Sequence, residues 1–155
     1  GHTIGMHTYS HDYAKVYASV DAYFQDLDQI GQMVQEEIGY VPCFIRFPGG
    51  SSNTVSKKYT TAIMSTLVQE VQNRGYQYYD WNGSSGDGSV RTTEELVAQA
   101  TSFDSNNIIL LCHDSHGKQT TVEALPQIIE HYQSLGYTFK ALDRDSFVAH
   151  HGVNN

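Results

Sequence analysis

The stretch GYVPCFIRF, residues 39–47, contains the junction on which the fold prediction depends. Its glycine follows a helical pattern and can take the left-handed conformation that ends a helix without strain. The run CFIRF after it is rich in residues that favour strands. The same junction recurs at Gly75-Tyr76 before QYYDW and at Gly136-Tyr137 before TFKAL. A chain that repeats helix, glycine and strand in this way is typical of an α/β protein.

Three of the expected helices carry clear signals. The second covers residues 59–71, with apolar residues at spacings of three and four. The third begins at Thr92, where Thr92 and Glu95 match a capping box. The first lies before residue 39 and places six apolar residues on one face: Val20, Phe24, Leu27, Ile30, Val34 and Ile38.

A fourth helix is expected to begin near Thr120 or Thr121, with Glu123 placed for another capping box. Pro126 fits this helix only in or near its first turn, because proline lacks the N–H that later turns require. Five short apolar runs rich in strand-forming residues separate the helices: HTIGM, CFIRF, YQYYDW, NIILLC and TFKAL.

The order of these elements predicts a parallel sheet with right-handed crossovers. Five strands are too few for a closed eight-stranded barrel, which takes about 250 residues. Part of a (β/α) barrel and an open doubly wound sheet therefore remain. The chain has no glycine-rich phosphate loop to favour a nucleotide-binding sheet. Its 155 residues are enough for one domain with a core.

Composition narrows the classes of partner. With nine Lys and Arg residues and a net charge of −8, the chain is poorly suited to the phosphates of a nucleic acid. No apolar run approaches the roughly 18 residues of a membrane span. An aromatic content of 12% is compatible with stacking against sugars. A serine nucleophile is not expected, because the chain has no G-x-S-x-G elbow.

Ionisable residues follow four of the predicted strands. The carboxyl ends of parallel strands meet at one edge, where chemistry gathers in α/β folds. Each residue also has an ordinary interpretation, such as a chance histidine pair, a surface arginine or a turn aspartate. Their occurrence at successive strand ends is what favours a site: His7 and His11, then Arg46, then Asp80-Trp81, then His113-Asp114.

Four motifs in this order and spacing, HTYSH, RFPGGSSN, DWNGSSGD and LLCHDS, resemble the second to fifth motifs of the polysaccharide deacetylases. The polysaccharide deacetylases share the NodB-homology domain and form carbohydrate esterase family four. The resemblance runs from Gly1 to the HHGVNN tail. It implies an α/β fold of the NodB type, an incomplete and distorted (β/α) barrel with five strands and about four helices in one domain, residues 1–155.

The resemblance also implies roles for individual residues. His7 and His11 match the metal-binding histidines of the family, with Zn²⁺ expected and Co²⁺ as an alternative. Arg46 matches the arginine that orients the catalytic base. His113 matches the general acid, and Asp80 matches the carboxylate that holds it and favours its protonated form.

Three further residues are matched to substrate binding. Gly49 stands where the family usually has an aromatic residue whose backbone N–H binds the oxyanion, so a backbone role could survive there. Trp81 matches a wall of the active-site groove, and Leu111 matches the leucine that lines the acetyl-methyl pocket. The implied reaction is metal-dependent hydrolysis of N-acetyl groups on a glycan, with peptidoglycan favoured over chitin.

One family motif is missing from these residues. The Thr-Phe-Asp-Asp strand end, which supplies the catalytic base and the acidic metal ligand, is absent. Asp12 and Asp114 remain as improvised ligands. We therefore expect a domain truncated at its N-terminus, with impaired activity unless an upstream segment is supplied.

Two other functions stay open at this point. One is a noncatalytic glycan-binding pseudoenzyme, and the other is an open-sheet α/β protein with an unrelated ligand. For the leading interpretation, the expected partner is an N-acetylated polysaccharide, and the expected location is extracellular or in a bacterial cell envelope. The oligomeric state cannot be predicted.

Overall fold

The computed structural model describes residues 1–154 and has an α/β architecture of five α-helices, one short 3₁₀ helix and four short strands within that range. The chain divides into two compact units, Gly1–Asp80 with the residues from Val148 onward, and Trp81–Phe147. The elements in order are α1 Tyr13–Val16, α2 Val20–Ile38, β1 Phe44–Ile45, η1 Ser56–Lys58, α3 Ile63–Asn73, β2 Gln77–Tyr78, β3 Gly83–Ser84, α4 Thr93–Ala100, β4 Leu110–Leu111 and α5 Gln119–Ser134.

A small parallel sheet organises the first unit. β1 pairs with β2, with Phe44 opposite Gln77. Met6 adds a single parallel bridge to Ile45 on the other side, through Met6 N to Phe44 O and Arg46 N to Met6 O, both 2.9 Å. The predicted parallel pairing is therefore present, but HTIGM contributes one bridged residue instead of a full strand.

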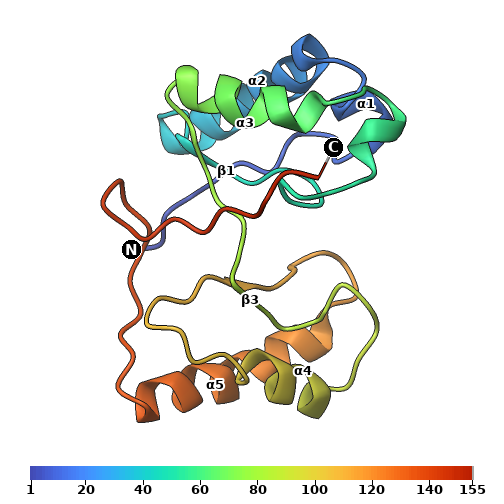
Figure 1. Cartoon of the computed structure of the whole chain (residues 1–155). Coiled ribbons are helices and arrows are strands. Elements are labelled where there is room, and N and C mark those ends of the chain that lie inside the picture. Colours follow the sequence, from blue (N-terminus) through green and yellow to red (C-terminus); the bar gives the residue numbers. More distant parts are fainter. Residues whose placement is uncertain (155) are drawn as a thin grey trace. The chain divides into compact units, whose positions relative to one another are not determined.

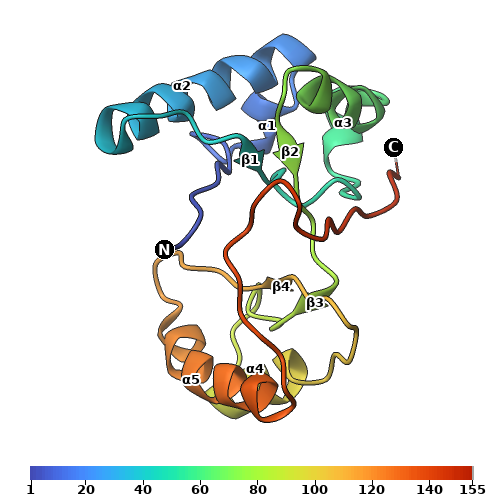
Figure 2. The same ribbon diagram turned by 90° about the vertical axis from the view of Figure 1, so that its left-hand side faces the viewer.

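The helices α2 and α3 cover one side of this sheet (Figures 1 and 2). Helix α2 begins at the N-cap Ser19 and ends at Gly39, whose φ of +85° confirms the predicted left-handed end. The start of the second predicted helix was wrong: η1 and a turn occupy residues 56–62, and α3 begins at Ile63. The core of the first unit contains side chains from the sheet region and from both helices, including Met6, Phe24, Leu27, Ile45, Phe47, Leu67, Val71 and Tyr78.

The segment from Val148 packs along β2 in the same unit. Asp80 N donates to Ala149 O at 2.9 Å, and the His150 ring stacks on Tyr78 with centroids 3.7 Å apart. His151 Nδ1 lies 3.0 Å from Ser52 Oγ. His150 and His151 therefore make structural contacts, although no sequence pattern indicated partners for them.

The second unit has β3 paired with β4 in parallel, Gly83 opposite Leu110. Helices α4 and α5 lie side by side against this pair (Figures 1 and 2), around a core of Leu96, Ala100, Ala124, Ile128 and Tyr132. The predicted capping box at Thr92 and Glu95 is confirmed.

Two local predictions for this unit were wrong. Helix α5 begins after Lys118 without a side-chain cap, so Glu123 forms no capping box and Pro126 lies well inside the helix. The run TFKAL, residues 138–142, forms no strand and instead borders a groove of about 810 Å³ beside Ile108 and Leu110. Strand β3 was not predicted, because NGSS has little of the β-branched or aromatic character typical of strands.

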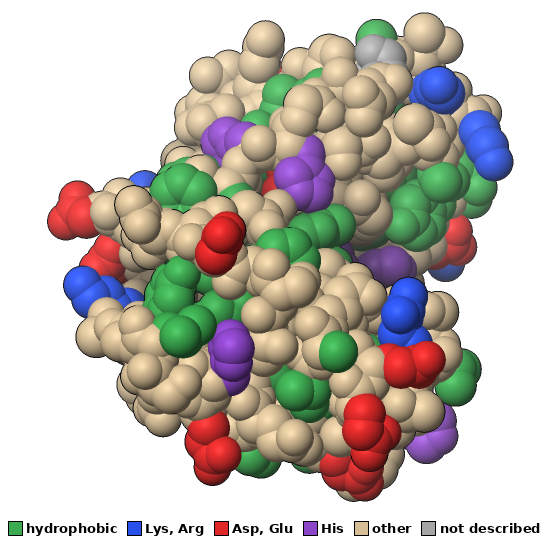
Figure 3. Space-filling model, turned by 60° about the horizontal axis from the view of Figure 1, so that its bottom comes forward, with side chains coloured by type: hydrophobic (Ala, Val, Ile, Leu, Met, Phe, Trp, Pro, Cys, Tyr) green, Lys and Arg blue, Asp and Glu red, His purple; other side chains and the backbone are tan. Residues whose placement is uncertain are grey.

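Within the described range, no helix combines the length and apolar character that crossing a membrane requires. On the face drawn in Figure 3, Asp and Glu side chains lie in several places and gather at the lower right, and Lys and Arg form separate small groups. That face has no continuous basic surface.

Candidate functional site

The histidine pair lies on a loop directly after the bridged residue Met6. His7 Nδ1 is 2.7 Å from the backbone oxygen of Arg46, so this nitrogen carries the proton and donates. Nε2 of His7 then keeps its lone pair, which is the arrangement that orients metal-binding imidazoles in proteins. The His11 ring lies with its centroid 4.9 Å from that of His7. Both histidines are exposed.

These two imidazoles fit two positions of a site for a divalent ion such as Zn²⁺, which binds histidine nitrogen. A third protein ligand is not present beside them, because no cluster of three or more His, Cys, Asp or Glu suited to a metal occurs in residues 1–154. Asp12, one of the improvised ligands considered from the sequence, instead caps α1 by accepting from Ala14 N at 2.9 Å. The donor set is therefore partial.

Arg46 and Gly49 flank the turn after β1. The Arg46 guanidinium donates to the carbonyl oxygens of Tyr79 and Asp80, at 3.0 Å and 3.2 Å. Gly49 has a φ of +77°, and a Cβ there would lie 2.7 Å from the Tyr13 hydroxyl. The glycine at the position of the family's aromatic residue therefore has a steric reason.

Asp80 is completely buried, and its carboxylate is part of a different network from the one predicted. It accepts from Ser51 N and His151 N, both at 2.8 Å, and from the Ser51 hydroxyl. Asp80 was predicted to hold His113, but its carboxylate has these donors within its own unit, and His113 Nδ1 bonds to Asp87. Asp80 instead joins the glycine-rich turn to the C-terminal segment.

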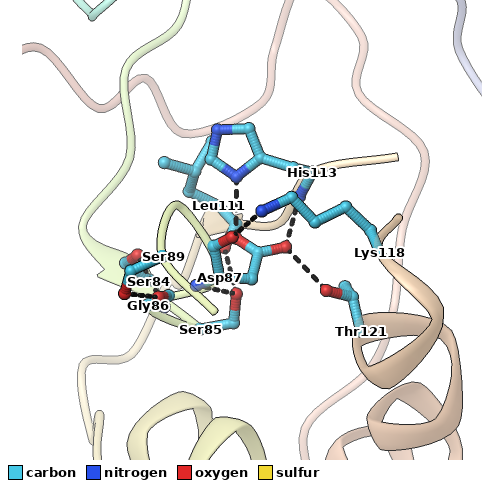
Figure 4. A network of polar contacts seen from close by, with 9 residues as sticks. All are labelled: Ser84, Ser85, Gly86, Asp87, Ser89, Leu111, His113, Lys118 and Thr121. Carbon is cyan, nitrogen blue, oxygen red and sulfur yellow. Dashed lines mark hydrogen bonds and ion pairs between the residues drawn. The ribbon is translucent and has the colours of Figure 1, made fainter. Parts of the chain in front are cut away.

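The carboxylate that holds His113 belongs to Asp87 (Figure 4). Asp87 Oδ1 lies 2.7 Å from His113 Nδ1, and Asp87 Oδ2 accepts from His113 N at 2.6 Å. Asp87 is 2% exposed, whereas the His113 side chain is 43% exposed. The buried acid thus fixes a histidine that is open to solvent.

Two more groups fix Asp87 itself. Thr121 Oγ1, at the start of α5, donates to Oδ2 at 3.0 Å, and the Lys118 amine donates to the Asp87 backbone oxygen (Figure 4). Burial raises the pKa of the Asp87 carboxyl, but hydrogen bonds from His113, Thr121 and Ser85 outweigh it and hold the pKa below its ordinary value. The carboxylate is therefore ionised at neutral pH and can only accept, so His113 Nδ1 must donate.

This arrangement leaves Nε2 as the reactive nitrogen of His113. A histidine whose Nδ1 bonds to a carboxylate is oriented for proton transfer at the other nitrogen, as in other acid–base sites. Leu111, on β4 two residues earlier, is half-buried, and its backbone oxygen accepts from Ser85 N at 3.0 Å. Trp81 is also half-buried, at the first position of the second unit.

The predicted site residues thus fall into two groups, one in each unit. His7, His11, Arg46, Gly49 and Asp80 belong to the first unit. Trp81, Leu111 and His113 belong to the second unit, together with Asp87, which the sequence reasoning missed.

Comparison with known proteins gives a consistent set of relatives, although no family model matches the chain. The catalytic domain of peptidoglycan N-acetylglucosamine deacetylase from Eubacterium rectale is 44% identical, with a TM-score of 0.95 over 100% of this chain and 71% of that one. A CE4 esterase from Streptococcus mutans is 26% identical, with a TM-score of 0.76 over 92% of this chain and 64% of that one.

A curated relative, peptidoglycan-N-acetylglucosamine deacetylase of Bacillus cereus, is 32% identical over 145 residues. The match covers 92% of this chain and 48% of the relative. The chain spans about half the length of the curated relatives it matches.

Proposed function

Because the chain belongs to the polysaccharide deacetylases of carbohydrate esterase family 4, we propose that it hydrolyses N-acetyl groups on a cell-wall glycan. The observation that carries this proposal is the bond between buried Asp87 and His113. Hydrolysis of an N-acetyl amide expels an amine, which needs a proton in order to leave. A histidine held at Nδ1 by a carboxylate and exposed at Nε2 is suited to supply that proton.

We propose Zn²⁺ as the cofactor, with Co²⁺ able to replace it, held by His7 and His11. When bound, such an ion polarises the acetyl carbonyl and lowers the pKa of water. The bond from His7 Nδ1 to the Arg46 carbonyl supports this role, because it directs Nε2 outward. Arg46 and the backbone at Gly49 would border the acetyl group on this side.

Activity of residues 1–155 is expected to be low, since the described residues supply two imidazoles without a third metal ligand beside them. Two neutral imidazoles bind Zn²⁺ more weakly than two imidazoles with a carboxylate, because the anionic ligand adds electrostatic attraction. A carboxylate from outside these residues would therefore be needed for full activity.

Peptidoglycan is the proposed substrate, with its N-acetylglucosamine or N-acetylmuramic acid units favoured over chitin. The names of the relatives from Eubacterium rectale and Bacillus cereus support peptidoglycan. Trp81 and Leu111, both half-buried in the unit that holds His113, are the proposed contacts for the sugar and for the acetyl methyl group. Because such a substrate lies in the cell wall, the proposed location is extracellular or in the cell envelope of a bacterium.

The test is chemical rescue with a small carboxylate. The chain is incubated with Zn²⁺ and either peptidoglycan fragments or chitooligosaccharide, with and without formate, and new free amines are measured by mass spectrometry. We expect little product without formate, more product with it, and a preference for peptidoglycan. Efficient hydrolysis without formate would refute the incomplete donor set. No product with formate, despite bound Zn²⁺, would refute the deacetylase proposal.

A further inference from the structure

The loop between the two histidines has a backbone conformation that its residues disfavour. Thr8 has a φ of +65° and His11 a φ of +50°. The left-handed region is uncommon for residues other than glycine, and for a β-branched residue such as threonine it is a genuine outlier. Such conformations persist where the surrounding structure imposes them, and they cluster at ligand clamps. The conformation of this loop therefore depends on the groups that hold it.

Asp26, on helix α2, is the main group outside the loop that holds it. Its Oδ1 accepts from Tyr9 N at 2.6 Å and from Ser10 N at 3.2 Å, and Oδ2 lies 3.3 Å from Ser10 N. Inside the loop, Thr8 Oγ1 accepts from His11 N at 3.2 Å. One carboxylate thus binds both amides in the middle of the His7–His11 segment.

The carboxylate is attached to a firmly packed helix. Phe24 and Leu27, on either side of Asp26 in sequence, are buried in the core of the first unit. Helix α2 is capped at both ends, by the Ser19 side chain and by the left-handed Gly39. Asp26 therefore ties the loop to a fixed support rather than to another loop.

We propose that Asp26 is a positioning residue that holds His7 and His11 ready for a divalent ion. Without its two bonds, Thr8 and His11 would relax from the left-handed region, and the rings would lose their relative arrangement. Ion binding would then have to order the loop, which weakens it. This inference depends on the proposed function in one respect, that His7 and His11 bind the ion.

The test measures Zn²⁺ binding to the metal-free chain by calorimetry, for the wild type, Asp26→Ala, Asp26→Asn and the control Asp28→Ala. Asp28 is exposed on the same helix, so its removal changes net charge equally without touching the loop. We expect Asp26→Ala to bind Zn²⁺ at least about tenfold more weakly than the wild type, because loss of outer-shell partners typically lowers metal affinity about 10- to 100-fold. Asp26→Asn retains one acceptor and should lose less, and the control should match the wild type.

A second readout needs no metal. In the metal-free chain, hydrogen exchange at the Tyr9 and Ser10 amides should accelerate in Asp26→Ala but not in Asp28→Ala. If Asp26→Ala does not fold, Asp26→Asn against Asp28→Asn decides the question by the same measurements. Wild-type affinity and unchanged exchange in the Asp26 variants would overturn the proposal. Absence of Zn²⁺ binding in the wild type would overturn the metal site, and this inference with it.

Discussion

Substitution of Asp87 by Asn tests directly how His113 is held. The change keeps the size of the side chain but replaces one carboxylate oxygen with an NH₂ group. In the structure, Oδ1 accepts from His113 Nδ1 and Oδ2 accepts from His113 N and from Thr121 Oγ1. An amide cannot accept at both positions, so a donor must face another donor on one side.

The size of the effect follows from the bond that is lost. A hydrogen bond to a charged group contributes about 1.5–3 kcal/mol. If this bond orients His113 in the transition state, each 1.36 kcal/mol corresponds to a tenfold change in rate. Asp87→Asn should therefore lower kcat for glycan deacetylation about 10- to 150-fold, with KM nearly unchanged.

The assay combines two measurements. Acetate release is measured in the presence of Zn²⁺ and formate, and the imidazole resonances are followed by NMR, which does not require activity. The wild type should show a His113 Nδ1–H resonance at neutral pH that is protected from exchange. Asp87→Asn should lose or shift this resonance. Asp80→Asn is the matched comparison: it should keep the resonance but destabilise the chain by about 1–3 kcal/mol, since a buried acceptor becomes a donor.

The opposite pattern would contradict the assignment of Asp87 as the residue that holds His113. If Asp80→Asn removed the His113 Nδ1–H resonance and Asp87→Asn preserved both the resonance and kcat, Asp80 would be the residue that holds the histidine. Equal, small effects of both variants would show that neither carboxylate orients it.

Three further outcomes are expected. Thr121→Val should lower kcat about fivefold, because it removes a hydrogen bond to Asp87 that contributes about 1 kcal/mol. Thr121→Ser keeps the hydroxyl and should restore kcat and a wild-type pH profile. Gly49→Ala should lower the free energy of unfolding in urea by at least about 1 kcal/mol, because φ is +77° and the new methyl group would meet Tyr13; a wild-type value would contradict the geometry. The folded-state pKa of Asp87 lies below its ordinary value, so the ionised carboxylate stabilises the fold above about pH 4, the unfolded pKa. This stabilisation is lost as the pH falls through the folded pKa. In urea titrations at acid pH, the free energy of unfolding should therefore fall less in Asp87→Asn than in the wild type.

The helices could be predicted from the sequence because their signals are local. The apolar face of α2, its end at Gly39 and the capping box at Thr92 depend on neighbours a few residues away, and all three are present. The strands were harder, because pairing depends on residues far apart. TFKAL has strand-forming residues but no strand partner in the described structure, and β3 pairs despite its glycine and serine.

The same distinction between local and long-range signals applies to the site residues. His7 and His11 could be proposed from the sequence because HTYSH is a local motif after an apolar run. Asp87 was missed because Asp80-Trp81 directly follows the strand YQYY, whereas Asp87 follows a glycine- and serine-rich loop. The useful signal was the parallel pairing of Ser84 with Leu111, which brings residues just beyond both strands together, but that pairing could not be deduced from local patterns.

We propose that the chain is a deacetylase in which His113 supplies the proton to the leaving amine. The most direct measurement is acetate release from peptidoglycan fragments by the wild type and by His113→Ala, with Zn²⁺ and formate present and Zn²⁺ affinity measured for both. We expect His113→Ala to lower kcat about 10²- to 10⁴-fold, the usual contribution of a general acid, with unchanged Zn²⁺ affinity. Activity of His113→Ala within about twofold of the wild type, where a general acid should supply orders of magnitude, would contradict it.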